Sequence, residues 1–437
     1  MKHPFPIRLL TPFAIFTFLT LVACHKSGSG SGAGPVITGI SPDSGHAGTV
    51  LTITGAHFDT VAKDNTVLID TVAAVVLQAS AEVLVVSVPV AHTGVVKVTT
   101  DAGTATGPVF NYQPDVVISG SQIDFTNGSS FPVALYWLNG KVVTLPGVPG
   151  GGAYALCVAG AGDDLYIGGF SGAGYTSAML WKNGVATYLT TTTVDARVSA
   201  LAVSGSDVYA AGFLNNGGKD IATVWKDGQI MFSADSTQNS QATAIAVSGG
   251  HVYIAGNVTN VPAHLAPSTS QPMLWVDGVQ DTLPDGSGYS KANAIVLSGT
   301  DVYVAGGVAT GAALWKNGTS FGLSPVLAGT VYFTGAAFAN NQLYLLGTNA
   351  TFPSGTSNWQ YSMFIYTTSS PYPIYTPSPG SNLQSNAIAF DGSDMYTTGT
   401  SGSGYTKVHY YKNGVDSLVD NKNDKTENTA SGLLIRR

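Results

Sequence analysis

The sequence predicts an all-β protein, and three observations support that class. Charged residues make up only 10% of the 437-residue chain, and glutamate and arginine are scarce. A helical protein of this size would use both of these good helix formers far more often. Short runs of alternating apolar and polar residues are separated by glycine, asparagine and aspartate, as expected for strands and turns. In addition, one strand phrase recurs along residues 115–437.

Residues 35–112 predict a small β-sandwich. In the runs 51–54 and 95–98, apolar and polar residues alternate, so each strand can bury one face and expose the other. Turn residues separate the runs at 41–45 and 101–103. Short strands with closely spaced turns favour an immunoglobulin-like fold.

This segment also carries a recognisable set of turn and strand residues. They are Ile40, Ser41, Pro42, Ser44, Gly45, Ala47, Gly48, Thr49, Thr54, Gly55, Phe58, Val88, Pro89 and Gly94. The set resembles the IPT/TIG domain, and the resemblance implies a spacer or a module associated with proteins or glycans. Some IPT/TIG domains occur in DNA-binding factors. Here only Lys63 and Lys97 are basic, so we expect a spacer.

A two-strand phrase recurs seven times after residue 115. One strand of the phrase, the second of its repeat, usually carries a Val-Tyr pair. The next strand usually ends in an aromatic residue closely followed by Asn-Gly or Asp-Gly, a strong hairpin signal. The period of about 40–50 residues is typical of propeller blades with four strands each. The aromatic phrases of these third strands are at Trp137, Trp181, Trp225, Trp275, Trp315, the degenerate segment 365–368, and Tyr411.

These repeats predict a seven-bladed β-propeller over residues 115–437. The first repeat begins at Asp115 with its second strand, and the chain ends in a first-strand phrase at residues 430–435. We therefore predict that the C-terminal strand completes the N-terminal blade. This closes the ring and removes an exposed sheet edge.

Several repeated residues have a structural interpretation. Aromatic side chains at equivalent places in every blade are expected to pack between neighbouring blades. The aspartates after the turns are expected to fix backbone geometry. Cys157 lies in an apolar run and is expected to be a buried small hydrophobe. The repeated aspartates are Asp164, Asp207, Asp301 and Asp394.

The connections between strands predict which face of the propeller binds a ligand. Turns from the first to the second strand and from the third to the fourth are short and uniform. The other connections are long and variable, as at 213–218, 258–271, 349–361 and 400–405. Functional residues concentrate in variable loops on a rigid scaffold, so we assign binding to this variable-loop face. Loop aromatics and amides suit sugar rings, although they can also simply pin the loops. The candidate ligand-binding residues are Tyr175, Arg197, Asn215, Asn216, Tyr289, Trp359, Tyr361 and Tyr405.

The N-terminus predicts export. Lys2 and Arg8 precede an apolar run at residues 9–22, which is typical of a signal peptide. The run ends in Leu-Val-Ala-Cys at residues 21–24, which resembles the lipobox of bacterial lipoproteins. The resemblance implies cleavage after residue 23 and lipidation of Cys24, followed by a Gly/Ser tether to residue 34. An ordinary secretory peptide is the alternative. We expect a lipid-anchored protein of the cell envelope, at the outer membrane. Both the periplasmic side and the surface side of that membrane stay open as its location.

The net charge and the motifs limit which partners, cofactors and reactions we expect for this protein. The formal net charge of −7 argues against nucleic acid as a partner. The scattered histidines make no zinc set, no phosphate loop is present, and we expect no cofactor and no metal. Glycoside hydrolysis needs two carboxylates close together, and nothing in the sequence pairs the acids near the variable loops. Those acids are Asp195, Asp220, Asp235, Asp281 and Asp285.

Three functions remain after these exclusions. The favoured one is a non-enzymatic binding lipoprotein whose propeller takes a glycan, or an envelope or extracellular protein, on its variable-loop face. The second is a propeller hydrolase or lyase acting on polysaccharide. It requires two acidic groups, or an acid and a histidine, at the mouth of the central channel. The third is a structural scaffold of the envelope. No catalytic residue is assigned.

Overall fold

The computed structural model describes residues 32–125, 131–191, 193–259, 270–284, 290–323, 330–351, 360–375, 382–402, 406–419 and 426–437. In these ranges the protein is all-β, as predicted, and the helical structure is limited to the 3₁₀ turn η1 (Ala62–Asp64). No helix in the described part is long and apolar enough to cross a membrane. The chain divides between Tyr112 and Gln113 into two compact units.

The N-terminal unit is an immunoglobulin-like sandwich, as predicted. Its strands hydrogen-bond in the order β1-β3-β6-β5-β4-β7-β8-β2. The predicted alternation is confirmed, because Leu51, Ile53, Val96 and Val98 are fully buried in one cluster. The strands are β1 (Val36–Ser41), β2 (Ser44–Gly45), β3 (Val50–Ala56), β4 (Thr66–Ile69), β5 (Val72–Ala79), β6 (Val83–Ser87), β7 (Gly94–Thr100) and β8 (Gly103–Tyr112).

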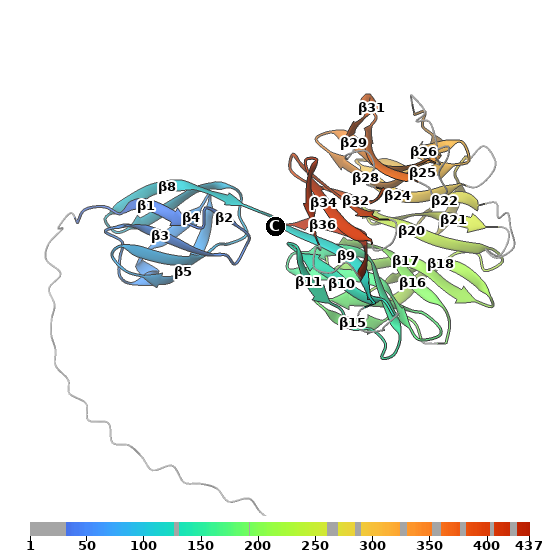
Figure 1. The fold of residues 1–437 in the computed structure, drawn as a ribbon, viewed down its shortest axis with the longest axis horizontal. Helices are drawn as coiled ribbons and strands as arrows, with labels where there is room; N and C mark the ends of the chain where they lie inside the picture. Colours follow the sequence, from blue (N-terminus) through green and yellow to red (C-terminus); the bar gives the residue numbers. More distant parts are fainter. Residues whose placement is uncertain are drawn as a thin grey trace, which may run out of the picture. The chain divides into compact units, whose positions relative to one another are not determined.

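The second unit is a seven-bladed propeller of four-stranded antiparallel sheets (Figure 1). Blade 1 contains β9 (Asp115–Asp124), β10 (Val133–Leu138), β11 (Lys141–Thr144) and β36 (Thr426–Arg436). Blade 2 contains β12 (Gly152–Ala161), β13 (Asp164–Gly172), β14 (Ser177–Lys182) and β15 (Val185–Tyr188). Blade 3 contains β16 (Ala196–Ser204), β17 (Asp207–Asn216), β18 (Lys219–Lys226) and β19 (Gln229–Ser233). Blade 4 contains β20 (Asn239–Ser248), β21 (His251–Thr259), β22 (Ser270–Val276) and β23 (Val279–Thr282).

The remaining three blades have the same order. Blade 5 contains β24 (Lys291–Ser298), β25 (Asp301–Val308), β26 (Gly311–Lys316) and β27 (Thr319–Ser320). Blade 6 contains β28 (Thr330–Ala339), β29 (Gln342–Thr351), β30 (Gln360–Thr367) and β31 (Ser370–Tyr375). Blade 7 contains β32 (Leu383–Asp391), β33 (Asp394–Ser401), β34 (Lys407–Lys412) and β35 (Val415–Leu418).

The ring closes as the sequence predicts. The last strand, β36, is the innermost strand of blade 1. It pairs antiparallel with β9, with which the propeller begins in the sequence, from Thr426 opposite Asp124 to Arg436 opposite Asp115. Figure 1 shows the red C-terminal strand lying along blue-green β9. The first strands of neighbouring blades contact one another around the whole ring. These first strands, β36 included, therefore surround the central axis.

Hairpin turns of one type join the outer strands of six blades. In blade 2, Asn183 and Gly184 have φ values of 50° and 82°, as a type I′ turn requires. The Asn183 side chain accepts from the Leu165 amide and donates to Asp164. The Asp164 carboxylate also lies 2.7 Å from the Lys182 ammonium, and this contact and Asn183 hold the pKa of Asp164 below its ordinary value. The repeated aspartates therefore fix the turn, as predicted, and also form an ion pair that the sequence analysis missed.

The repeated aromatics pack as predicted. All five tryptophans of the repeat are at most 1% exposed. Trp181 lies in a cluster with Val117 and Ala134 of blade 1, so its indole fills the space between two blades. The interpretation of Cys157 is also confirmed: it is buried, and burial raises the pKa of its thiol.

Candidate functional site

A β-bulge recurs at the same place in every first strand. Each pairing of a first strand with its second strand shifts register by one residue near the start of the first strand. Bulges redirect side chains and are common beside functional sites. In six of seven blades the bulged residue is polar. The bulged residues are Leu156, Ser199, Thr243, Asn293, Thr334, Asn386 and Ser431.

Several bulged side chains connect adjacent blades. The Thr243 hydroxyl donates to the carbonyl of Ala292 in the next blade at 2.6 Å. The Asn293 amide donates to the Phe333 carbonyl at 2.8 Å. In both cases the acceptor is the residue just before the next bulge, so these bonds fix the spacing of the first strands around the axis.

Two residues before each bulge lies a second set of equivalent positions, here named the mouth ring. These positions fall near the beginning of each first strand, where the connection from the preceding blade arrives. They therefore lie on the variable-loop face. The mouth ring consists of Tyr154, Arg197, Gln241, Lys291, Tyr332, Gln384 and Thr429.

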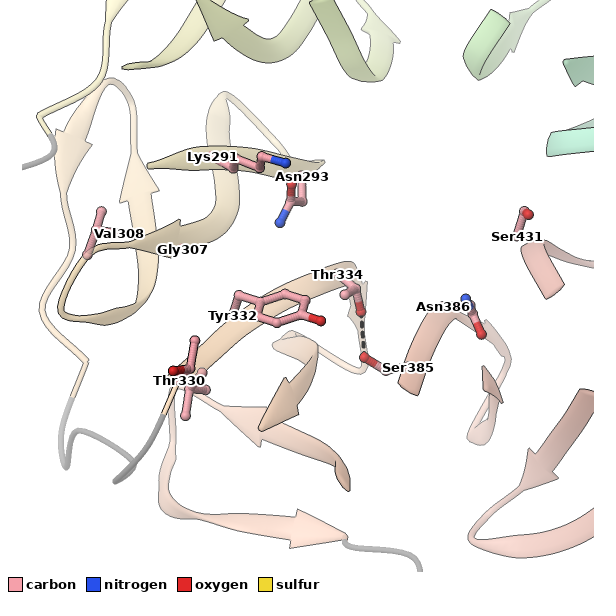
Figure 2. Close-up of a pocket in the computed structure, with 11 residues that line it drawn as sticks. Lys291, Asn293, Gly307, Val308, Thr330, Tyr332, Thr334, Ser385, Asn386 and Ser431 are labelled. Atoms are coloured by element: carbon pink, nitrogen blue, oxygen red, sulfur yellow. Dashed lines mark hydrogen bonds between the residues drawn. The ribbon is translucent and has the colours of Figure 1, made fainter. Parts of the chain in front are cut away.

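The first strands of blades 5, 6, 7 and 1 and the end of β25 line a cavity of about 560 Å³ beside the mouth ring, here named the channel-mouth cavity. Figure 2 shows Lys291, the Tyr332 ring and the side chains of Asn293 and Asn386 around a common space, with Ser431 across it. The described lining holds no carboxylate and no histidine. Its residues are Lys291, Asn293, Gly307, Val308, Thr330, Val331, Tyr332, Thr334, Ser385, Asn386 and Ser431.

Hydroxyl groups brace the floor of this cavity. Ser385 lies 2.7 Å from the hydroxyl oxygen of Thr334 and 2.7 Å from that of Thr348 (Figure 2 shows the first of these bonds). Ser385 and Thr348 are buried. Burial also raises the pKa of the Tyr332 hydroxyl above its ordinary value.

The described lining of this cavity includes none of the candidates Tyr175, Arg197, Asn215, Asn216 and Tyr361. Tyr175 is 58% exposed in the turn between β13 and β14. Tyr361 lies in β30, near enough to Tyr332 to influence its titration. Tyr289, Trp359, Tyr405 and the lipidation candidate Cys24 fall outside the described residues.

Asn215, Asn216 and Tyr361 were expected in loops but lie in strands. Arg197 lies in β16, and the two asparagines end β17, where they pair with Asp220 and Lys219 of β18. We expected a loop at residues 213–218, and this prediction is wrong for residues 213–216. Strand β17 continues to Asn216, and the chain turns only at Gly217 and Gly218.

Arg197 and Asn215 belong to one hydrogen-bonded network. The Arg197 guanidinium donates to Gln241 at 2.9 Å, and Gln241 donates to Asp220 at 2.7 Å. Asn215 donates to the other oxygen of Asp220 at 3.0 Å. The guanidinium also stacks over Phe213, 4.8 Å from the ring centroid. This network fixes the side chains where blades 3 and 4 meet at the mouth.

A serine, a histidine and an aspartate form a hydrogen-bonded chain in blade 7. Ser401 lies 2.8 Å from Nε2 of His409, whose Nδ1 lies 3.0 Å from Asp416. The order matches a nucleophile, base and orienting acid. However, Ser401 does not line the channel-mouth cavity. The chain links β33, β34 and β35, and we interpret it as a cross-strand brace.

The cavity residues carried a signal that the sequence analysis did not use. Each bulged residue sits between two mostly small residues just before the recurring apolar first-strand phrase, as in Ala-Asn-Ala at 292–294 and Ser-Asn-Ala at 385–387. Comparing this single position across the seven repeats would have revealed a polar ring.

A comparison with known protein families confirms the IPT/TIG domain in the first unit. A family model of the IPT/TIG domain matches residues 35–133. The match continues beyond the sandwich across β9, which the structure places in blade 1. The chain therefore contains an IPT/TIG domain followed by a seven-bladed propeller. No curated protein matches the chain.

Several solved structures are distantly similar to this chain. A structural genomics protein of unknown function from Bacteroides thetaiotaomicron VPI-5482 is 12% identical, with a TM-score of 0.35, over 83% of this chain and 94% of its own. An auxiliary nutrient binding protein from Bacteroides ovatus ATCC 8483 is 14% identical, with a TM-score of 0.35, over 84% and 96%. An exo-1,5-alpha-L-arabinanase from a bovine ruminal metagenomic library is 10% identical, with a TM-score of 0.30, over 52% and 98%. Similarities at this level carry no argument about function.

Proposed function

We propose that this protein is an envelope lipoprotein that binds a saccharide on the variable-loop face of its propeller, without chemical turnover. The observation that carries the proposal is the channel-mouth cavity, which lies beside the mouth ring on the face that the strand connections single out. Its volume of about 560 Å³ falls within the roughly 300–1,000 Å³ typical of small-molecule sites.

The chemistry of the lining supports a saccharide. Serine, threonine and tyrosine hydroxyls and asparagine amides both donate and accept hydrogen bonds, as sugar hydroxyls do. Tyr332 adds an aromatic ring at the same place. Because these groups sit on strands fixed by inter-blade bonds, little ordering is needed when a ligand binds.

The remaining segments fit a tethered binding module. Lipidation at Cys24 would hold the chain on the membrane, with residues 24–34 as the tether and the IPT/TIG domain as the spacer. The propeller would then be the part that meets the ligand.

Saccharide binding is tested by screening a chain that begins at His25 against a glycan array and a panel of envelope proteins. We expect selective retention of saccharides and at least a tenfold loss of affinity in Tyr332→Ala. Phe321, 38% exposed, lines a separate cavity with residues of the short first-to-second-strand turn, so Phe321→Ala is the control and should bind normally. A folded protein that retains only proteins, or equal losses in both variants, contradicts the proposal. Cleavage of a retained saccharide would indicate the hydrolase or lyase alternative.

The anchor is tested separately by cell fractionation after labelling with a radioactive fatty acid. We expect the wild-type chain in the membrane fraction with label, and Cys24→Ser in the soluble fraction without label. Cys157→Ser provides the matched cysteine control and should behave as wild type. Membrane retention of an unlabelled wild-type chain would refute lipidation at Cys24.

A further inference from the structure

The channel-mouth cavity has an apolar niche on one side. The niche is bounded by Gly307 and Val308 at the end of β25 and by the ring of Tyr332 (Figure 2). Gly307 pairs with the mouth ring in blade 5, where blades 2 and 3 have Phe170 and Phe213. A Cβ at Gly307 would lie 2.9 Å from the Cβ of Tyr332, which is too close, so glycine is required there. The niche is therefore open to a small apolar group of a ligand.

Two asparagines also line the cavity, and the fold determines which amide atom of each is presented to a ligand. Nδ2 of Asn293 donates to the Phe333 carbonyl at 2.8 Å, so this residue presents its Oδ1, a hydrogen-bond acceptor. The Ala430 amide donates to the Thr400 hydroxyl at 3.3 Å, and that hydroxyl donates to Oδ1 of Asn386 at 3.2 Å. Asn386 therefore presents its Nδ2, a donor. Because Asn293 lies in β24, which pairs with β25, its acceptor is beside the niche.

These features define the substituent that fits the niche. An acetamido group combines a methyl group, which gains from contact with apolar surface, and an N–H donor, which matches Oδ1 of Asn293. A hydroxyl group in the same place would lose water against Gly307 and Val308, whose side chains give it no polar partner. Hydroxyl groups elsewhere on a sugar ring match Nδ2 of Asn386 and the hydroxyl of Ser431.

We infer that the channel-mouth cavity takes an N-acetylated sugar unit, a 2-acetamido hexose, with its methyl group in the niche and its N–H donating to Asn293. This inference rests on the proposed saccharide-binding function and names the class of saccharide. Selectivity over plain hexoses follows, because a hexose places a hydroxyl group where the niche presents apolar surface.

The experiment titrates the full chain with N-acetyl-D-glucosamine, N-acetyl-D-galactosamine, D-glucose, D-galactose and L-rhamnose, with binding measured by saturation-transfer NMR. At least one acetamido sugar should bind about tenfold more tightly than its parent hexose, because the buried methyl group and the N–H bond both add affinity. Its methyl protons should receive more saturation than its ring protons. L-Rhamnose carries a methyl group without an N–H donor and should bind less tightly than the acetamido sugar.

Two substitutions test the niche and the acceptor separately. Val308→Thr replaces a methyl group of the niche by a hydroxyl group and should lower the preference for the acetamido sugar about threefold. The matched control is Val279→Thr, the same exchange at a residue that is 72% exposed in β23, and it should leave all affinities unchanged. Asn293→Ala removes the acceptor and should lower the same preference. Since it also breaks the bond to Phe333, its melting curve is recorded, and Val308→Thr decides if this variant does not fold.

The outcomes separate this inference from the proposed function. Equal binding of acetamido sugars and hexoses, equally tight binding of L-rhamnose, or an unchanged preference in Val308→Thr overturns the inference while saccharide binding stands. Binding of none of the five sugars also overturns it. If the glycan array retains other saccharides, the proposed function survives that result; if the array is silent as well, both fail.

Discussion

Deletion of residues 426–437 will prevent the propeller from folding as a stable monomer. These residues form β36, the first strand of blade 1, which pairs with β9 along its whole length. Ala430 and Asn428 of this strand are buried. Without β36, blade 1 loses its innermost strand and β9 becomes an exposed edge that can pair with another chain. We expect aggregation, or loss of the cooperative melting transition of the propeller, in calorimetry and size-exclusion chromatography.

Two comparisons make this experiment specific to ring closure. Deletion of Arg437 alone removes a partly buried ion pair with Asp391 but leaves β36 in place, so the cooperative melting transition should persist. A synthetic peptide of residues 426–437, added to the truncated chain during refolding, should restore part of the folded protein. A truncated monomer that melts like the wild type would show that β36 does not close the ring.

The architecture was predictable because its determinants are local and repeated. An Asn-Gly pair such as Asn183-Gly184 specifies a hairpin wherever it occurs, and a buried aromatic at the same place in each repeat specifies the contact between blades. Closure was also predictable, because a first strand missing at Asp115 and an extra one at residues 430–435 leave only one way to complete the ring.

The candidate site was not predictable to the same degree, because it depends on register and on juxtaposition across the ring. A bulge is a shift between two paired strands, and no single segment such as 291–298 reveals it. Lys291 and Ser431 meet in one cavity although they are distant in sequence. Long connections were also taken for loops, whereas in blade 3 the pairing of Asn215 with Asp220 extends the strands into them. The described candidates named from the sequence, such as Tyr175 and Asn215, do not line that cavity.

Trp181→Ala will destabilise the propeller by about 3–5 kcal/mol, the range for removing a large buried aromatic side chain. Trp181 is fully buried between blades 1 and 2, and its indole nitrogen donates to the Pro146 carbonyl at 2.7 Å. The substitution therefore leaves both a cavity and a carbonyl without its donor. Urea unfolding followed by circular dichroism measures the loss. Tyr175→Ala removes an aromatic side chain that is 58% exposed in the same blade, and it should cost less than about 0.5 kcal/mol.

A second pair of substitutions separates the packing of the indole from its hydrogen bond. The indole nitrogen of Trp225 is equally buried but has no hydrogen-bond partner among the described residues. Replacement by phenylalanine removes similar volume from both sites, but only at Trp181 does it break a hydrogen bond. Trp181→Phe should therefore cost about 1–3 kcal/mol more than Trp225→Phe, because a buried polar group that loses its partner is expensive. Equal losses at the two sites would mean that packing alone, and not the bond to Pro146, accounts for the contribution of the indole at the blade interface.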